Sequence, residues 1–303
     1  MRNVGLGMVP RCRGASKSDR ARARERGQSL VLYALALSAL VATLALGIDG
    51  GYAYAQRRRM QTAADAAALA GARVIGLGGG SGQVSTAVTQ YATNNGADGA
   101  SWQYVGGGNG IRVTAQRTFN TFFAGFVGYP TMTASATAEA SLDYLSAAGN
   151  LLPIAVHEQD FIFGQSYTLW DDNHEAPGAF GWIDWSPPAG GNSELADAIL
   201  NPSRSGWRQV GEWLNTQTGV SGSSGVRNAL DYWPNRHVTV PIYDQITGTG
   251  DNTQYHLIGF AEFVMTAYDF HGSDKSITGY FIRWVESGPG GGTTGVRTVR
   301  LTN

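Results

Sequence analysis

Cysteine is almost absent from this sequence, with one residue among 303. Because Cys12 has no second cysteine to pair with, a disulfide within one copy of the chain is excluded. This scarcity does not exclude export, since an oxidising compartment permits disulfides without requiring them. Roughly 250 residues follow the apolar segment described below, and a chain of that length can bury a core without disulfides.

Motifs that carry chemistry are also missing. The sequence contains neither a His-Glu-x-x-His zinc motif nor a Gly-x-Ser-x-Gly nucleophile motif, and the glycine run at 77–82 lacks the Gly-Lys-Ser/Thr ending of a phosphate loop. The best candidate metal ligands are Asp171, Asp172 and Glu175, but the alternating ligands and central glycine of an EF-hand are absent. A polar turn is the favoured interpretation. We therefore predict no catalytic residue, no bound metal and no cofactor.

Charge is sparse and unevenly distributed. Residues 1–29 carry eight Lys and Arg against Asp19 and Glu25, whereas acidic residues outnumber basic ones in the remainder. No charge occurs in Ser29–Ile48, and 20 helical residues cover the roughly 30 Å apolar core of a bilayer. The sequence predicts a transmembrane helix over 29–48 with the lipid bilayer as a partner. The acidic remainder gives no support for nucleic-acid binding.

The basic residues also predict an orientation. Seven Lys and Arg lie between Arg11 and Arg26, whereas the 20 residues after the span contain only Arg57, Arg58 and Arg59. Positive charge accumulates on the cytoplasmic side, so residues 1–28 are predicted to form a cytoplasmic tail and the rest to lie outside. The apolar run is longer than that of a cleaved signal peptide. An uncleaved anchor is therefore favoured, with cleavage near Gly47 as the alternative.

Residues 49–76 are predicted to continue as an alanine-rich extracytoplasmic helix. Gly50 and Gly51 suggest a hinge between this helix and the span. Asp49 is interpreted as a polar residue at the membrane edge, or else as an ion-pair partner of Arg57–Arg59. Within the span, Ala39, Thr43 and Gly47 are small residues four apart, which either allow close helix packing in lipid or reflect the composition alone.

The order of features over residues 26–74 resembles the N-terminal segment of the TadE/TadG-like proteins of Flp (tight-adherence) pilus assembly systems. An Arg-Gly-Gln precedes the span, an Asp-Gly-Gly follows it, and a basic cluster and an alanine-rich stretch come next. The resemblance implies a bacterial single-pass envelope protein. The positions that carry the motif are Gly27, Gln28, Asp49, Gly50, Gly51, Arg58, Gln61 and Asp65.

One departure from the family pattern bears on the role. Processed pseudopilins of these systems carry a Glu shortly after the glycine at the cleavage site, whereas the span that follows Gly27 contains no acid. The TadG-like interpretation, an unprocessed membrane anchor, is therefore favoured over a polymerising pilin. Cleavage at Gly27 stays open as an alternative.

Two further units are expected after the helix. Residues 83–145 predict a small α+β, pilin-like unit with a helix, a hairpin, a short aromatic helix at Phe119–Val127 and a strand at Met132–Leu142. Residues 150–303 predict a β-rich extracytoplasmic domain with a central strand at 277–286 and a loop at 288–292. Its expected helices are Ser193–Leu200, Gly206–Gln217 and Val226–Asp231.

These features together predict an α+β protein with a long N-terminal transmembrane helix that extends outside. The leading hypothesis is a non-enzymatic component of a Flp/Tad-type pilus assembly or secretion apparatus, with pilus assembly or envelope proteins as partners. The alternative is a surface adhesin or glycan-binding protein, because seven tryptophans after residue 150 could stack on sugars or else form a core. An envelope hydrolase or metalloenzyme is the third hypothesis and the least supported.

Overall fold

The computed structural model describes residues 17–169, 179–187, 191–218, 222–270 and 275–302. They form an α+β structure, as predicted, and divide into two compact units. The first unit comprises the described residues up to Gln56 together with Thr118–Ala134, and the second comprises Arg57–Arg117 and the described residues from Ser135 onward.

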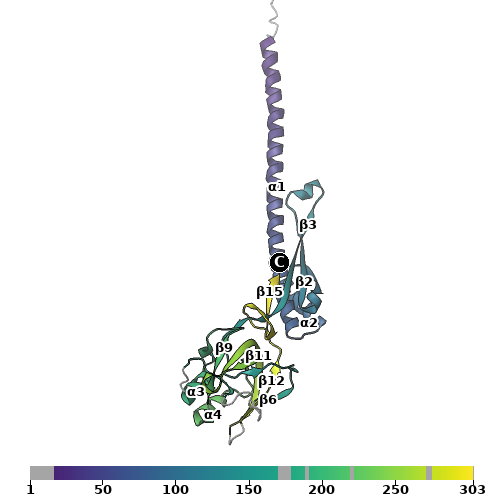
Figure 1. Ribbon diagram of the computed structural model, residues 1–303. Coiled ribbons are helices and arrows are strands. Elements are labelled where there is room, and N and C mark those ends of the chain that lie inside the picture. Colours follow the sequence, from purple (N-terminus) through teal and green to yellow (C-terminus); the bar gives the residue numbers. More distant parts are fainter. Residues whose placement is uncertain (1–16, 170–178, 188–190, 219–221, 271–274, 303) are drawn as a thin grey trace, which may run out of the picture. The chain divides into compact units, whose positions relative to one another are not determined.

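Helix α1 (Lys17–Gly76) contains the apolar span and the alanine-rich segment in one continuous run of 60 residues (Figure 1). It contains no proline, and alanine and leucine, which favour helices, dominate it. The hinge expected at Gly50 and Gly51 is not found, because both glycines have helical backbone. Each glycine costs only about 1 kcal/mol relative to alanine, and the turns on either side offset that cost.

The first unit consists of the N-terminal part of α1 and the connection between strands β2 (Gly110–Asn120) and β3 (Thr131–Leu145). The prediction of a helix over Phe119–Val127 was wrong in extent. Phe119 still belongs to β2, and only Ala124–Val127 coil, as the 3₁₀ turn η2. Gly128 ends this turn with a φ of 99°, a backbone conformation that glycine adopts without strain.

The second unit begins with the C-terminal part of α1, helix α2 (Ser81–Asn94) and the hairpin of β1 (Gly99–Val105) with β2, in the predicted order. Five alanines of α1 are fully buried here: Ala63, Ala64, Ala67, Ala68 and Ala72. An added Cβ on Gly71 would lie 2.7 Å from Ile111 Cδ1 and 3.0 Å from Val88 Cγ2. Small side chains thus let β2 and α2 approach the helix closely.

The end of the chain returns to this sheet. Strand β15 (Arg297–Thr302) pairs antiparallel with β3, and β13 (Gly290–Gly292) pairs with the last residues of β3 (Figure 1). The loop expected at 288–292 is therefore partly a strand. A fragment that begins at residue 150 would lack the partner of β15.

The larger sheet has the strand order β5-β10-β11-β12-β6. Its long central strands are β10 (His237–Thr247), β11 (Gln254–Asp269) and β12 (Ser276–Ile282), and β12 is internal, as predicted. The shorter strands are β5 (Val156–His157), β6 (Ser166–Leu169), β7 (Ala179–Ile183), β9 (Trp213–Thr218) and β14 (Thr294–Gly295), while β4 (Ala147–Ala148) pairs with β8 (Arg208–Gln209) in a separate ladder.

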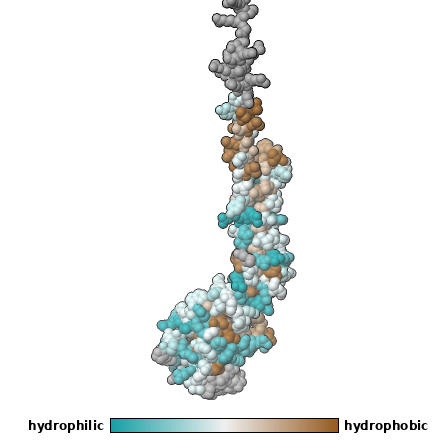
Figure 2. Space-filling view, turned by 45° about the horizontal axis from the view of Figure 1, so that its top comes forward, coloured by the Kyte–Doolittle hydropathy of each residue, from teal (hydrophilic) through white to brown (hydrophobic). Residues whose placement is uncertain are grey.

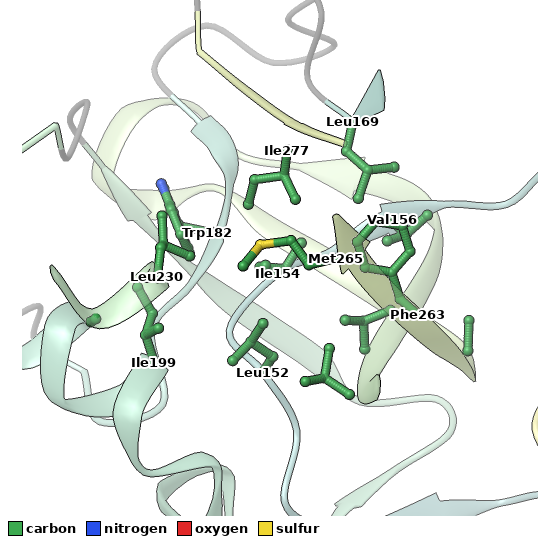
Figure 3. Close-up of a cluster of buried hydrophobic side chains, with 14 of the residues drawn as sticks. Leu152, Ile154, Val156, Leu169, Trp182, Ile199, Leu230, Phe263, Met265 and Ile277 are labelled. Carbon is green, nitrogen blue, oxygen red and sulfur yellow. The ribbon is translucent and has the colours of Figure 1, made fainter. Parts of the chain in front are cut away.

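The core of this region lies between the large sheet and two short helices (Figure 3). Helices α3 (Asn192–Leu200) and α4 (Ser224–Leu230), both predicted, contribute Ile199 and Leu230 to it, and Trp182 and Phe263 are fully buried there. The helix predicted over Gly206–Gln217 was wrong. Gly206 and Gly211 have positive φ, which interrupts a helix, and the segment forms β8 and β9 instead.

Candidate functional site

The apolar part of α1 meets the requirements of a membrane-spanning helix. Every residue of Ser29–Ile48 is exposed except Ala45, which is half-buried, and this is the one helix among the described residues that is long and apolar enough to cross a bilayer. The hydroxyls of Ser38 and Thr43 donate to the carbonyls of Ala34 and Ala39, each at 2.8 Å. These two hydroxyls are therefore satisfied within the span, as an apolar medium demands.

Within the span, Ala39, Thr43 and Gly47 lie along an exposed face. Nothing lies within 4 Å of a Cβ placed on Gly47, so the face is open at that point. Their use in helix packing stays a prediction.

Asp49, the first residue after the span, holds the β2–β3 connection. Its Oδ1 accepts a hydrogen bond from the backbone N–H of Phe122 at 2.7 Å, and its Oδ2 accepts from Phe123 at 2.9 Å and Ala124 at 2.6 Å. The side chain is buried. Neither interpretation from sequence included these partners, because Asp49 binds backbone amides across 73 to 75 residues of chain.

An aromatic contact reinforces this attachment one turn further along α1. The ring of Tyr52 lies edge-on to Phe119 at 5.2 Å and to Phe122 at 5.3 Å between ring centroids. Such edge-to-face pairs contribute about 0.5–1.5 kcal/mol each beyond their buried area. A buried carboxylate and two aromatic pairs thus fix the loop to the helix at the end of the span.

Of the other motif positions, Arg58, Gln61 and Asp65 lie in the second unit. Gln61 donates through Nε2 to Asp65 Oδ1 at 2.8 Å and to the carbonyl of Thr137 in β3 at 3.4 Å. Gln61 is thus the side-chain partner that the structure gives Asp65. Arg57, Arg58 and Arg59 are exposed. Gln61 therefore links the matched helix to the small sheet.

A second feature is a cavity of about 760 Å³ in the second unit, with Glu262 in its wall. The Glu262 carboxylate is 3% exposed; Oε1 contacts His237 Nδ1 and Oε2 accepts from Thr239 Oγ1 at 2.9 Å. Burial raises the pKa of Glu262 above its usual value against the opposing effect of these two bonds, and nearby Glu286 raises it further. The His237 ring packs at a tilt against Trp284, with 4.8 Å between the ring centroids, and Trp207 is largely exposed at the rim.

The arrangement has no sign of a metal centre in the part of the chain that the structure describes. No three His, Cys, Asp or Glu side chains come together there. Asp171, Asp172 and Glu175 lie outside the described residues. The sequence did not single out His237 or Glu262, since only the register of β10 on β11 brings them together.

One long apolar helix, exposed over the length of a bilayer and continuous with a folded α+β region, defines a single-pass membrane protein. Residues 27–74 match the model of a family described as Putative Flp pilus-assembly TadE/G-like, which confirms the resemblance found in the sequence. The match contains the span, Asp49 and the alanine-rich part of α1, and it supports a role related to pilus assembly. No curated protein and no solved structure matched the chain.

Proposed function

We propose that the protein is a membrane-anchored component of a Flp/Tad-type, type IV-like pilus assembly or secretion apparatus that acts by protein–protein contacts and not by catalysis. The observation that carries this proposal is the family match over 27–74, which contains the one candidate span found among the described residues. In a clean deletion strain we expect loss of piliation or adherence, restored by the full chain. Normal piliation without the gene would contradict the proposal.

The proposed orientation places residues 1–28 in the cytoplasm, Ser29–Ile48 in the membrane and the chain from Asp49 onward outside. The charge asymmetry across Ser29–Ile48 supports it. Cys12, the single cysteine, provides a direct test. In spheroplasts a membrane-impermeant maleimide should leave Cys12 unlabelled until the cells are lysed, whereas Ser101→Cys in a Cys12→Ser background should label at once.

We further propose that the anchor stays uncleaved and serves as a fixed tether for the exported region. The absence of an acid from the span and its length support this. The intact mass of the purified protein distinguishes the full chain from a form cut after Gly27 or near Gly47. A mass that begins at residue 28 would favour the processed, pilin-like alternative.

The motif and the open face of the span suggest where contacts with partners form. Ala39, Thr43 and Gly47 would admit another membrane helix at close range. Thr43→Leu should weaken co-purification with pilus assembly proteins, and Leu40→Ile, which alters no small residue, serves as the control. Equal recovery of partners with both variants would remove this face from the proposal.

The second candidate is a glycan-binding surface protein on the same anchor. The observation that favours it is the cavity beside Glu262, where Trp207 and Trp284 offer ring faces on which sugars could stack. Because β15 pairs with β3, the full chain in detergent is the proper sample for a glycan array. Binding that Trp207→Ala abolishes would support this candidate, and a blank array with folded protein would reject it.

A further inference from the structure

The connection between β2 and β3 exposes large apolar side chains that folded proteins normally bury. Phe126 is 90% exposed, Val127 75% and Tyr129 67%, and Phe122 is also exposed. No charged residue occurs from Thr118 to Ala138. Scattered exposed apolar residues are ordinary, but an uncharged cluster of this kind marks a surface that meets another apolar phase.

The position of this loop along α1 is fixed within the first unit. Asp49, which directly follows the apolar run, holds the amides of Phe122, Phe123 and Ala124. Ala45 lies one turn earlier on the same helix face and is the one residue of Ser29–Ile48 with reduced exposure. The cluster therefore begins at the level where the span ends, and η2 lies beside α1 in Figure 1.

We propose that residues Phe122–Tyr129 insert into the interfacial layer of the bilayer as a second membrane contact beside the span. This inference rests on the membrane anchoring in the proposed function and extends it, because the family match ends at residue 74 and does not include the loop. Phe and Tyr side chains are suited to this layer, where aromatic residues gather in membrane proteins.

Other residues of α1 agree with a position of the loop in the interfacial layer. Tyr54 is 65% exposed on α1 near the same level, and Arg57, Arg58 and Arg59 follow. The arginines come eight to ten residues after Asp49 in the sequence, and long basic side chains of this kind settle among lipid headgroups. Apolar span, aromatic residues and basic residues thus succeed each other in the order that a bilayer surface requires.

Lipid is the occupant that these observations favour over a protein partner. The exposed cluster continues the lipid-facing surface of the span, and Figure 2 shows strongly apolar residues on the first unit. The consequence is mechanical. A single helix is free to rotate about its axis, whereas a helix with a second contact on one side has a fixed rotation relative to the membrane.

The test uses the full chain reconstituted in phosphatidylcholine–phosphatidylglycerol vesicles. A Cys12→Ser background makes the chain cysteine-free, so an environment-sensitive fluorophore can be placed on Phe126→Cys, with Leu40→Cys and Ser101→Cys as the lipid and water references. We expect the label at 126 to lose emission to a shallow nitroxide lipid and to resist aqueous iodide. The label at 40 should respond to a deep nitroxide, and that at 101 to iodide alone.

Asp49→Asn adds an internal check, since an amide lacks the second acceptor oxygen and presents a donor to the loop amides. In that background the nitroxide effect at 126 should fall while the label at 40 is unchanged. Iodide quenching at 126 with normal lipid quenching at 40 would overturn the insertion and leave the anchor intact. Protection of 126 from both quenchers would indicate a second copy and would also overturn it. Failure at 40 would overturn the anchor and the insertion together.

Discussion

The two halves of α1 are both rich in apolar residues but have opposite surroundings. In the first half, leucine and valine side chains are exposed on all faces, with Leu37 at 64% and Leu40 at 58%. In the second half, Ala64 and Ala68 are fully buried against protein. The comparison teaches that side-chain size, more than hydrophobicity, decides the partner of each half. Large side chains cover a helix that faces lipid, and small ones let a sheet approach.

Polar residues mark the change between the halves. Asp49 ends the lipid-facing part by binding the β2–β3 loop, and Gln61 begins the protein-facing part by bonding to β3. Both residues lie in the matched segment, so the motif contains one attachment for each compact unit.

The largest expected effect is that of a charge in the buried half. Ala68→Lys should destabilise the second unit by about 3–5 kcal/mol, the range associated with an uncompensated buried charge. Denaturant unfolding of the full chain in detergent, followed by tryptophan fluorescence, measures this. Leu69→Lys, one residue away and 36% exposed, is the control and should change little. Equal destabilisation by both variants would contradict the buried surroundings assigned to this half of α1.

A charge in the exposed half should act on insertion instead. Leu40→Lys should disfavour membrane insertion by about 2.5–3.5 kcal/mol, the cost of a lysine near the centre of a span. Carbonate extraction of membranes reports the inserted fraction. The stability of the second unit in detergent should stay at the wild-type value, and a loss of stability there would show that the span packs on protein.

The third effect distinguishes two helical glycines. Gly71→Ala should destabilise the second unit by about 1–3 kcal/mol, because its new methyl group meets Ile111 and Val88. Gly82→Ala in α2 meets nothing within 4 Å and should stabilise by about 0.5–1 kcal/mol. Thermal unfolding of both variants checks the difference in sign. Stabilisation by both would mean that the alanine-rich face is not closely packed.

The smallest expected effect is a pH dependence that belongs to the second unit. Because the pKa of Glu262 is raised in the folded protein, its contribution to stability is complete below the unfolded value of about 4.5 and is lost as pH rises through the folded value. Glu262→Gln should therefore reduce the loss of stability between acidic and neutral pH. His237→Ala removes a bond that favours the charged form and should enlarge that loss. Identical pH profiles for all three proteins would show that Glu262 is not the group responsible.

Local patterns in the sequence predicted much of the fold and little of the site. Alanine and leucine content identified α1, alternation identified β3, and helical spacing identified α2 and α4. Residue spacing predicted a helix over 206–217. Gly206 and Gly211 have positive φ, which interrupts a helix, and the segment forms strands instead. The partners of Asp49 and Glu262, and the pairing of β15 with β3, depend on contacts distant in sequence. No local pattern encodes them.

The most direct test of the account is an accessibility scan of α1 by single spin labels at positions 36–72, in the cysteine-free chain reconstituted in vesicles. The account predicts that labels at 36–44 are accessible to oxygen on every face and shielded from a water-soluble nickel chelate. From position 60 onward, accessibility should oscillate with the helical period and be lowest at the buried alanines. Chelate access throughout 36–44, or oscillation there with a shielded face, would contradict a helix that passes from lipid to protein.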